Sequence, residues 1–159
     1  MLELFSNYSS TIIFVHVLSA IIWIGSMITL RVAVHPALQN IENPTIKLGK
    51  TLEIMKRVLN LVIPMIILLI VTAVIMTIGL KFKGTSLYTM VLVKEAIWTI
   101  MTIIFIIIYI KRFQAEKLFK KRAFEEAKTK IKTVPNILLP INITLGFVAL
   151  YLGIVLRGF

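Results

Sequence analysis

The chain has 159 residues, 58% of them hydrophobic, and a mean hydropathy of +0.95. This length fits one domain, 1–159, which cannot bury so much apolar surface in a soluble core, so we expect an integral membrane protein. The formal net charge is +11, but the basic residues lie between apolar stretches, where they report membrane topology rather than nucleic-acid binding. The absence of cysteine excludes disulfides and thiolate metal sites.

Four apolar stretches are long enough to cross a bilayer, which takes about 20 residues of helix. They predict an all-α, four-helix bundle in contact with lipid, with membrane spans at residues 11–33, 58–80, 85–110 and 134–156. The leader before the first span contains Glu3 and no lysine or arginine. Because a cleavable signal has a basic leader, we expect the first span to remain in the protein.

The basic residues predict the orientation of the bundle. Two of the three connections contain 14 of the 18 basic residues: Arg31, Lys47, Lys50, Lys56 and Arg57 in the first, and Lys111, Arg112, Lys117, Lys120, Lys121, Arg122, Lys128, Lys130 and Lys132 in the third. With four crossings both connections lie on one side, and the positive-inside rule makes that side cytoplasmic. Both termini are therefore predicted on the non-cytoplasmic side.

Helical extensions and a bend are predicted near the ends of these spans. Residues Thr45–Arg57 are expected to extend span two beyond the membrane. The segment Lys111–Lys132 is expected to continue span three and then turn. The pairs His35-Pro36 and Asn43-Pro44 predict a bent loop after span one, because proline breaks the helical hydrogen-bond pattern.

His16 is the first candidate for chemistry, because an imidazole inside a membrane span is costly unless it is hydrogen-bonded or binds a metal. Ser19, Trp23 and Met27 share its helical face. Two interpretations stay open: a hydrogen bond to a facing helix, or a ligand. His35 lies 19 residues further on, roughly 28 Å along one helix, so the two histidines cannot hold one metal; we expect His35 to be an interfacial residue.

Lys94 and Glu95 are the second candidate, because ionisable groups at membrane depth usually face a cavity or each other. Adjacent residues diverge by about 100° on a helix, so one faces the bundle better, and the sequence leaves open which. Lys94 lies in the same half of the bilayer as His16, where it could meet an anionic group such as a haem propionate or extend to the headgroups. In span four, Asn142 and Thr144 are candidates for hydrogen bonds between helices.

Four motifs together resemble two related membrane families. These motifs are HVLSAIIWIG from His16, KRVLN from Lys56, VLVK from Val91 and VPNILL from Val134. They resemble the copper resistance D family and the HemJ-type protoporphyrinogen oxidase family, both of which have a histidine in the first helix with a tryptophan seven residues on. The resemblance extends from about residue 11 to the C-terminus. The end of the first span, residues 27–36, looks more like the copper resistance D pattern.

The resemblance implies a haem b within the bundle, with His16 as its axial ligand and Trp23 beside it. Arg57 and Lys94 would be partners of propionates or of substrate carboxylates. The implied protein is a multi-pass component of the bacterial inner membrane that works in electron transfer or copper handling.

Two alternatives to this function stay open. The first is a HemJ-type oxidase of protoporphyrinogen IX, which passes electrons towards quinone, so the resemblance leaves open whether the chain is an enzyme. The second is a haem-free component of copper transport or resistance. The expected partners are the lipid bilayer, a quinone or another redox protein, and a second copy of the chain, because four helices give little room to enclose a porphyrin.

Overall fold

The computed structural model describes residues 2–80, 84–85 and 87–156, and in this part every regular element is helical. Four helices are long and apolar enough to cross a membrane, which confirms the predicted all-α membrane bundle. The elements are α1 (Leu2–Ile28), η1 (Thr29–Val34), α2 (His35–Gln39), α3 (Pro44–Gly79), α4 (Tyr88–Lys120), α5 (Phe124–Ile131), η2 (Val134–Leu138) and α6 (Leu139–Val155).

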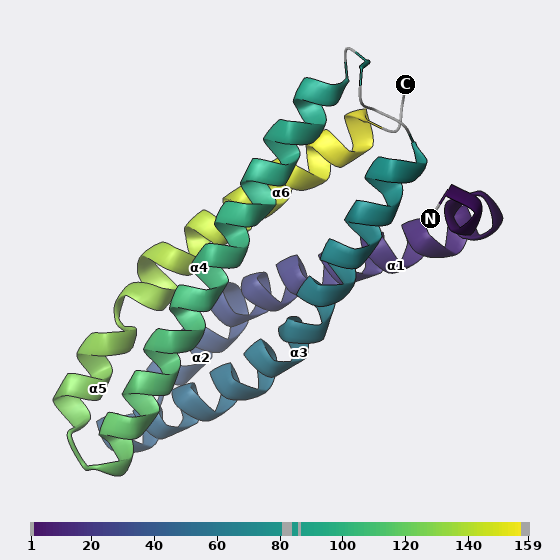
Figure 1. The fold of residues 1–159 in the computed structure, drawn as a ribbon. Coiled ribbons are helices and arrows are strands. Elements are labelled where there is room, and N and C mark those ends of the chain that lie inside the picture. Colours follow the sequence, from purple (N-terminus) through teal and green to yellow (C-terminus); the bar gives the residue numbers. More distant parts are fainter. Residues whose placement is uncertain (1, 81–83, 86, 157–159) are drawn as a thin grey trace.

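The four long segments run side by side (Figure 1). The start of α1, the end of α3, the start of α4 and the end of α6 lie at one end of the bundle, which we call the terminal end. The α2–α3 connection and the α4–α5 turn lie at the other, which we call the basic end. The two basic connections share one end, as the positive-inside prediction requires. Which side of the membrane that end faces stays a prediction.

Wide, π-type helical turns precede Pro36 and Pro140. The first of them lies where the sequence predicts a bend, and it keeps the chain helical. The first segment does not bend into a loop at His35-Pro36: η1 continues directly into α2, and the His35 N–H donates to the carbonyl of Leu30, five residues back. A proline ring presses on the carbonyl four residues before it, and a π-type turn relieves that contact. The same occurs before Pro140, where the Leu139 N–H donates to the carbonyl of Val134.

The predicted helical extensions at the basic end are confirmed. α3 begins at Pro44, where the Asn43 side chain accepts hydrogen bonds from two backbone amides of the first turn, and it covers all of Thr45–Arg57. α4 continues to Lys120, and the chain then reverses through Arg122, which has a positive φ of 62°. A second cluster of buried apolar side chains packs at this end and consists of Leu48, Leu52, Ala115, Ala127 and Ile131.

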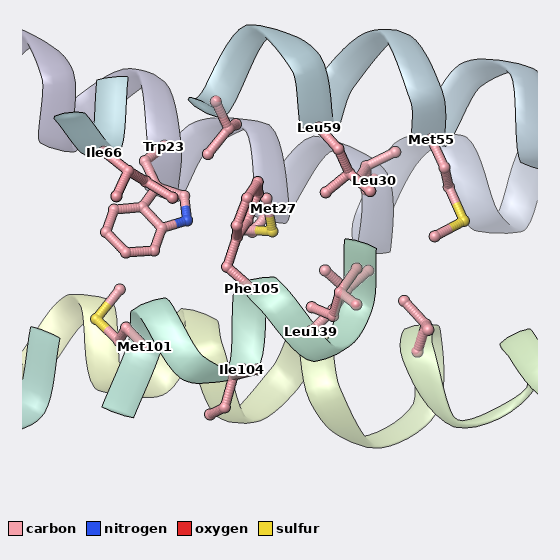
Figure 2. Packing of buried hydrophobic residues seen from close by; sticks show 13 residues of the cluster. Trp23, Met27, Leu30, Met55, Leu59, Ile66, Met101, Ile104, Phe105 and Leu139 are labelled. Atoms are coloured by element: carbon pink, nitrogen blue, oxygen red, sulfur yellow. The ribbon is translucent and has the colours of Figure 1, made fainter. Parts of the chain in front are cut away.

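The main core lies between the four helices from the middle of the bundle towards the basic end (Figure 2). Trp23 and Met27 of α1 face Phe105 of α4, and the rings of Trp23 and Phe105 meet edge to face with their centroids 6.3 Å apart. Leu59 and Val62 of α3 are fully buried in the same cluster. Because lipid is as apolar as these side chains, such packing acts through van der Waals contact rather than the hydrophobic effect.

One cation lies inside the basic end. The Arg112 side chain is 3% exposed and forms an ion pair with Glu116, one turn further along α4. Its Nε has no hydrogen-bond partner within the described ranges. An intrahelical acid therefore neutralises this buried charge.

Candidate functional site

The inward face of α1 includes His16. Ile12, Ser19, Trp23 and Met27 are buried and recur at steps of seven, four and four, which marks one face of the helix. His16 falls on that face between Ile12 and Ser19, yet its side chain remains partly accessible. The packing beside the imidazole is therefore less closed than the packing one turn above or below it.

The sequence leaves open whether Lys94 or Glu95 faces the bundle, and in the structure Lys94 lies on the inward face of α4. Val91, Met101 and Phe105 are buried on this face, and Lys94 follows Val91 by three residues. Its Nζ lies against α6, where a Cβ atom placed on Gly153 would be only 3.2 Å away. Of the adjacent pair, Lys94 is thus the residue in contact with a neighbouring helix at this level.

Four helices bring one residue each to this level of the terminal half, and we call His16, Thr72, Lys94 and Gly153 together the His16 niche. The His16 Nδ1 lies 2.8 Å from the Thr72 Oγ1 on α3. The Thr72 hydroxyl also donates to the carbonyl of Leu68, one turn back, at 2.6 Å. Lys94 of α4 lies beside Gly153 of α6, so the niche consists of two contacts, one between α1 and α3 and one between α4 and α6.

The lysine of the niche has no acidic partner among the described residues. Within residues 2–80, 84–85 and 87–156, Lys94 forms no hydrogen bond and no ion pair. The same part of the chain contains no cluster of three or more His, Cys, Asp or Glu side chains that could hold a metal ion alone. The niche therefore offers one imidazole and one ammonium group, a set that suits a ligand with a metal and an acidic group.

The other two predicted site residues lie away from the niche. Arg57 is at the basic end, where its side chain is 78% exposed and pairs with Glu53 at 2.8 Å. Trp23 is on the same face as His16 but about two turns closer to the basic end, and it is only 3% exposed in the filled core. The structure thus places His16 and Lys94 in the terminal half of the bundle, each against a neighbouring helix, and Arg57 in the basic half.

The expected hydrogen bonds between helices at Asn142 and Thr144 are not formed. The Thr144 hydroxyl donates to the carbonyl of Pro140 in its own helix at 3.0 Å. Asn142 is 1% exposed, and neither its amide nitrogen nor its amide oxygen has a partner in the described residues. The Nε1 atoms of Trp23 and Trp98 are also buried and unpaired there. The middle of the bundle therefore contains polar atoms that the described side chains do not satisfy.

A pocket of about 480 Å³ opens at the basic end, between the start of α3 and the α4–α5 turn. Arg122 and Lys128 contribute positive charge to its wall, and Glu125 and Glu126 contribute negative charge. Because these charges offset each other, the pocket does not favour an ion of either sign, and the His16 niche remains the better candidate site.

Comparisons with known proteins leave the niche without a characterised counterpart: no protein-family model, no curated protein and no solved structure matches the chain. The resemblance to the copper resistance D and HemJ-type families therefore rests on the four motifs quoted above. What the chain shows of itself is a multi-pass membrane protein with four apolar helices.

Proposed function

We propose that this protein binds haem b through His16 and carries electrons at the membrane. The observation that supports the proposal is the His16 niche, where an imidazole and an ammonium group to which no described residue offers an acidic partner lie on the inward faces of an apolar bundle. Haem carries an iron that takes an axial imidazole and propionates that pair with cations, so it fits both groups at once. When bound, haem supplies a one-electron couple.

Three residues of the niche have distinct parts in this proposal. His16 would hold the haem iron, and Lys94 would pair with a propionate. Gly153 presents bare backbone beside Lys94, which lets the lysine lie close to α6. The filled core around Trp23 and Phe105 closes the niche on the side of the basic end, and such burial is one means by which a protein sets a haem potential.

The orientation proposed from charge places the niche in the half of the bilayer away from the cytoplasm. In a bacterial inner membrane, electrons would then enter or leave on that side. The partner in such transfer would be a quinone in the lipid or another redox protein.

The position of Arg57 separates this proposal from the HemJ-type oxidase. A porphyrinogen substrate held by both Arg57 and Lys94 would have to reach from one end of the bundle to the other, because the two residues lie at opposite ends. Lys94 alone is available beside His16. The niche therefore favours a bound haem over a substrate site that uses both cations.

The test is the visible spectrum of the protein purified in detergent from a bacterial membrane. We expect a Soret band from one haem per chain. His16→Ala should abolish it, and Lys94→Met should weaken haem binding while the band keeps its position. His35→Ala is the matched control, because His35 pairs only with Gln39, at 3.4 Å, among the described residues, and should retain full haem.

Three results would overturn the proposal. One is a folded wild-type protein that takes up no haem when it is supplied. Another is a His16→Ala variant with an unchanged spectrum. A third is stoichiometric copper without haem, which would support the copper-handling alternative. Circular dichroism and size-exclusion profiles of each variant establish that the fold is retained.

A further inference from the structure

The Thr72 hydroxyl has a single proton, and three groups lie within hydrogen-bond distance of it. The carbonyl oxygen of Leu68 lies 2.6 Å from Oγ1, the carbonyl oxygen of Leu69 lies 3.2 Å away, and the His16 Nδ1 lies 2.8 Å away. A carbonyl can only accept, whereas an imidazole nitrogen either donates or accepts. Because the shortest contact is to an obligatory acceptor, the hydroxyl proton goes to Leu68, and Oγ1 accepts from His16.

The imidazole therefore has its proton on Nδ1. The alternative, in which Thr72 donates to Nδ1, would put the ring proton on Nε2. It would also give up the 2.6 Å bond to Leu68.

We propose that Thr72 is a positioning residue that fixes His16 as the Nδ1–H tautomer, so that Nε2 presents its lone pair to the niche. The identity of the group that Nε2 binds rests on the proposed function, but the tautomer itself is a property of the ligand-free protein. Histidines that bind metals commonly donate their other N–H to a protein oxygen, which fixes the ring and increases its basicity. A threonine hydroxyl on the facing helix would do this here.

The direct test is nitrogen-15 NMR of histidine-labelled protein without haem, at a pH where the imidazole is neutral. The chain has two histidines, so a His35→Ala background leaves His16 as the single signal. We expect a protonated Nδ1 and an unprotonated Nε2. Thr72→Val, which keeps the shape and removes the oxygen, should shift the ring towards the Nε2–H form, and Thr72→Ser should restore the wild-type pattern.

A second readout is haem affinity, measured by titration of the same variants. Loss of such a supporting hydrogen bond weakens metal binding by about 10- to 100-fold in other proteins, and we expect Thr72→Val to fall in that range while Thr72→Ser stays near wild type. An Nε2–H ring in the wild type, or an unchanged tautomer in Thr72→Val, would overturn the inference. An Nδ1–H ring in a protein that binds no haem would uphold the inference and remove the proposed function, so the two failures are distinguishable.

Discussion

Gly146 allows α6 to approach α1 and α4 closely, and filling that space should destabilise the bundle. A Cβ atom placed on Gly146 would lie 2.9 Å from the Ile24 Cγ1 and 3.3 Å from the Met101 Cε. The methionine end is flexible, but Cγ1 of a branched side chain has little freedom to move. We therefore expect Gly146→Ala to introduce overpacking of about 1–3 kcal/mol.

A matched glycine in α1 isolates that contribution. Gly25 has no atom within 4 Å of an added Cβ, so Gly25→Ala changes only backbone propensity, a gain of up to about 1 kcal/mol. Gly146→Ala has the same gain in propensity and the clash in addition. The net expectation is a loss of about 0–2 kcal/mol at Gly146, and a difference of about 1–3 kcal/mol between the two variants.

The assay is reversible unfolding in mixed micelles, followed by circular dichroism, with Ile24 varied on the other side of the contact. Ile24→Ala removes the colliding Cγ1, so its combination with Gly146→Ala should be less destabilised than the sum of the single variants. Ile24→Val keeps an atom at Cγ1 but removes Cδ1, which an added Cβ would approach to 3.1 Å, so it should give less relief than Ile24→Ala. Equal stability of Gly25→Ala and Gly146→Ala, or strict additivity in the Ile24→Ala cycle, would refute the packing described here.

Three further predictions concern polar groups and orientation. Asn142→Leu should raise the free energy of unfolding in micelles by about 1–3 kcal/mol, because it removes two unsatisfied buried amide atoms; a decrease would mean that a bound water or ligand satisfies the amide. Glu116→Gln should destabilise the same transition by about 3 kcal/mol, because it leaves a buried arginine unpaired, whereas Glu53→Gln, in an exposed pair, should change it by less than about 1 kcal/mol. In intact cells, a membrane-impermeant thiol reagent should label the Gly84→Cys variant and should not label the Lys121→Cys variant. The reverse pattern would invert the proposed topology.

The spans follow from the sequence because the lengths of apolar runs and the distribution of lysine and arginine are signals along the chain, independent of tertiary contacts. The continuation of the first segment through Pro36 does not follow from them. Proline is expected to end a helix because it lacks an N–H, but a π-type turn shifts the hydrogen bonds by one residue and lets the helix continue. That adjustment has no composition signature in the sequence.

The part of the candidate site that could be predicted from the sequence is its ionisable residues, because a charge is costly to bury in a membrane span. His16 and Lys94 are conspicuous because each is ionisable at membrane depth. The choice between Lys94 and Glu95 depends on how span three is rotated, which is settled by its contact with Gly153 of another helix. Thr72 gives no signal at all, because a threonine that bonds its own helix is tolerated in lipid and resembles any other span residue.

The two inward cations of α4 show why an external acid is expected at the niche. Lys94 and Arg112 are 18 residues apart, which is about five helical turns, so they lie on the same face. Four residues after Arg112 the chain supplies Glu116, which neutralises it. Four residues after Lys94 it supplies Trp98, whose own Nε1 is an unpaired donor among the described residues. Because an unpaired ammonium group is costly at membrane depth, the proposed acidic ligand would supply the acceptor that no described residue offers to Lys94.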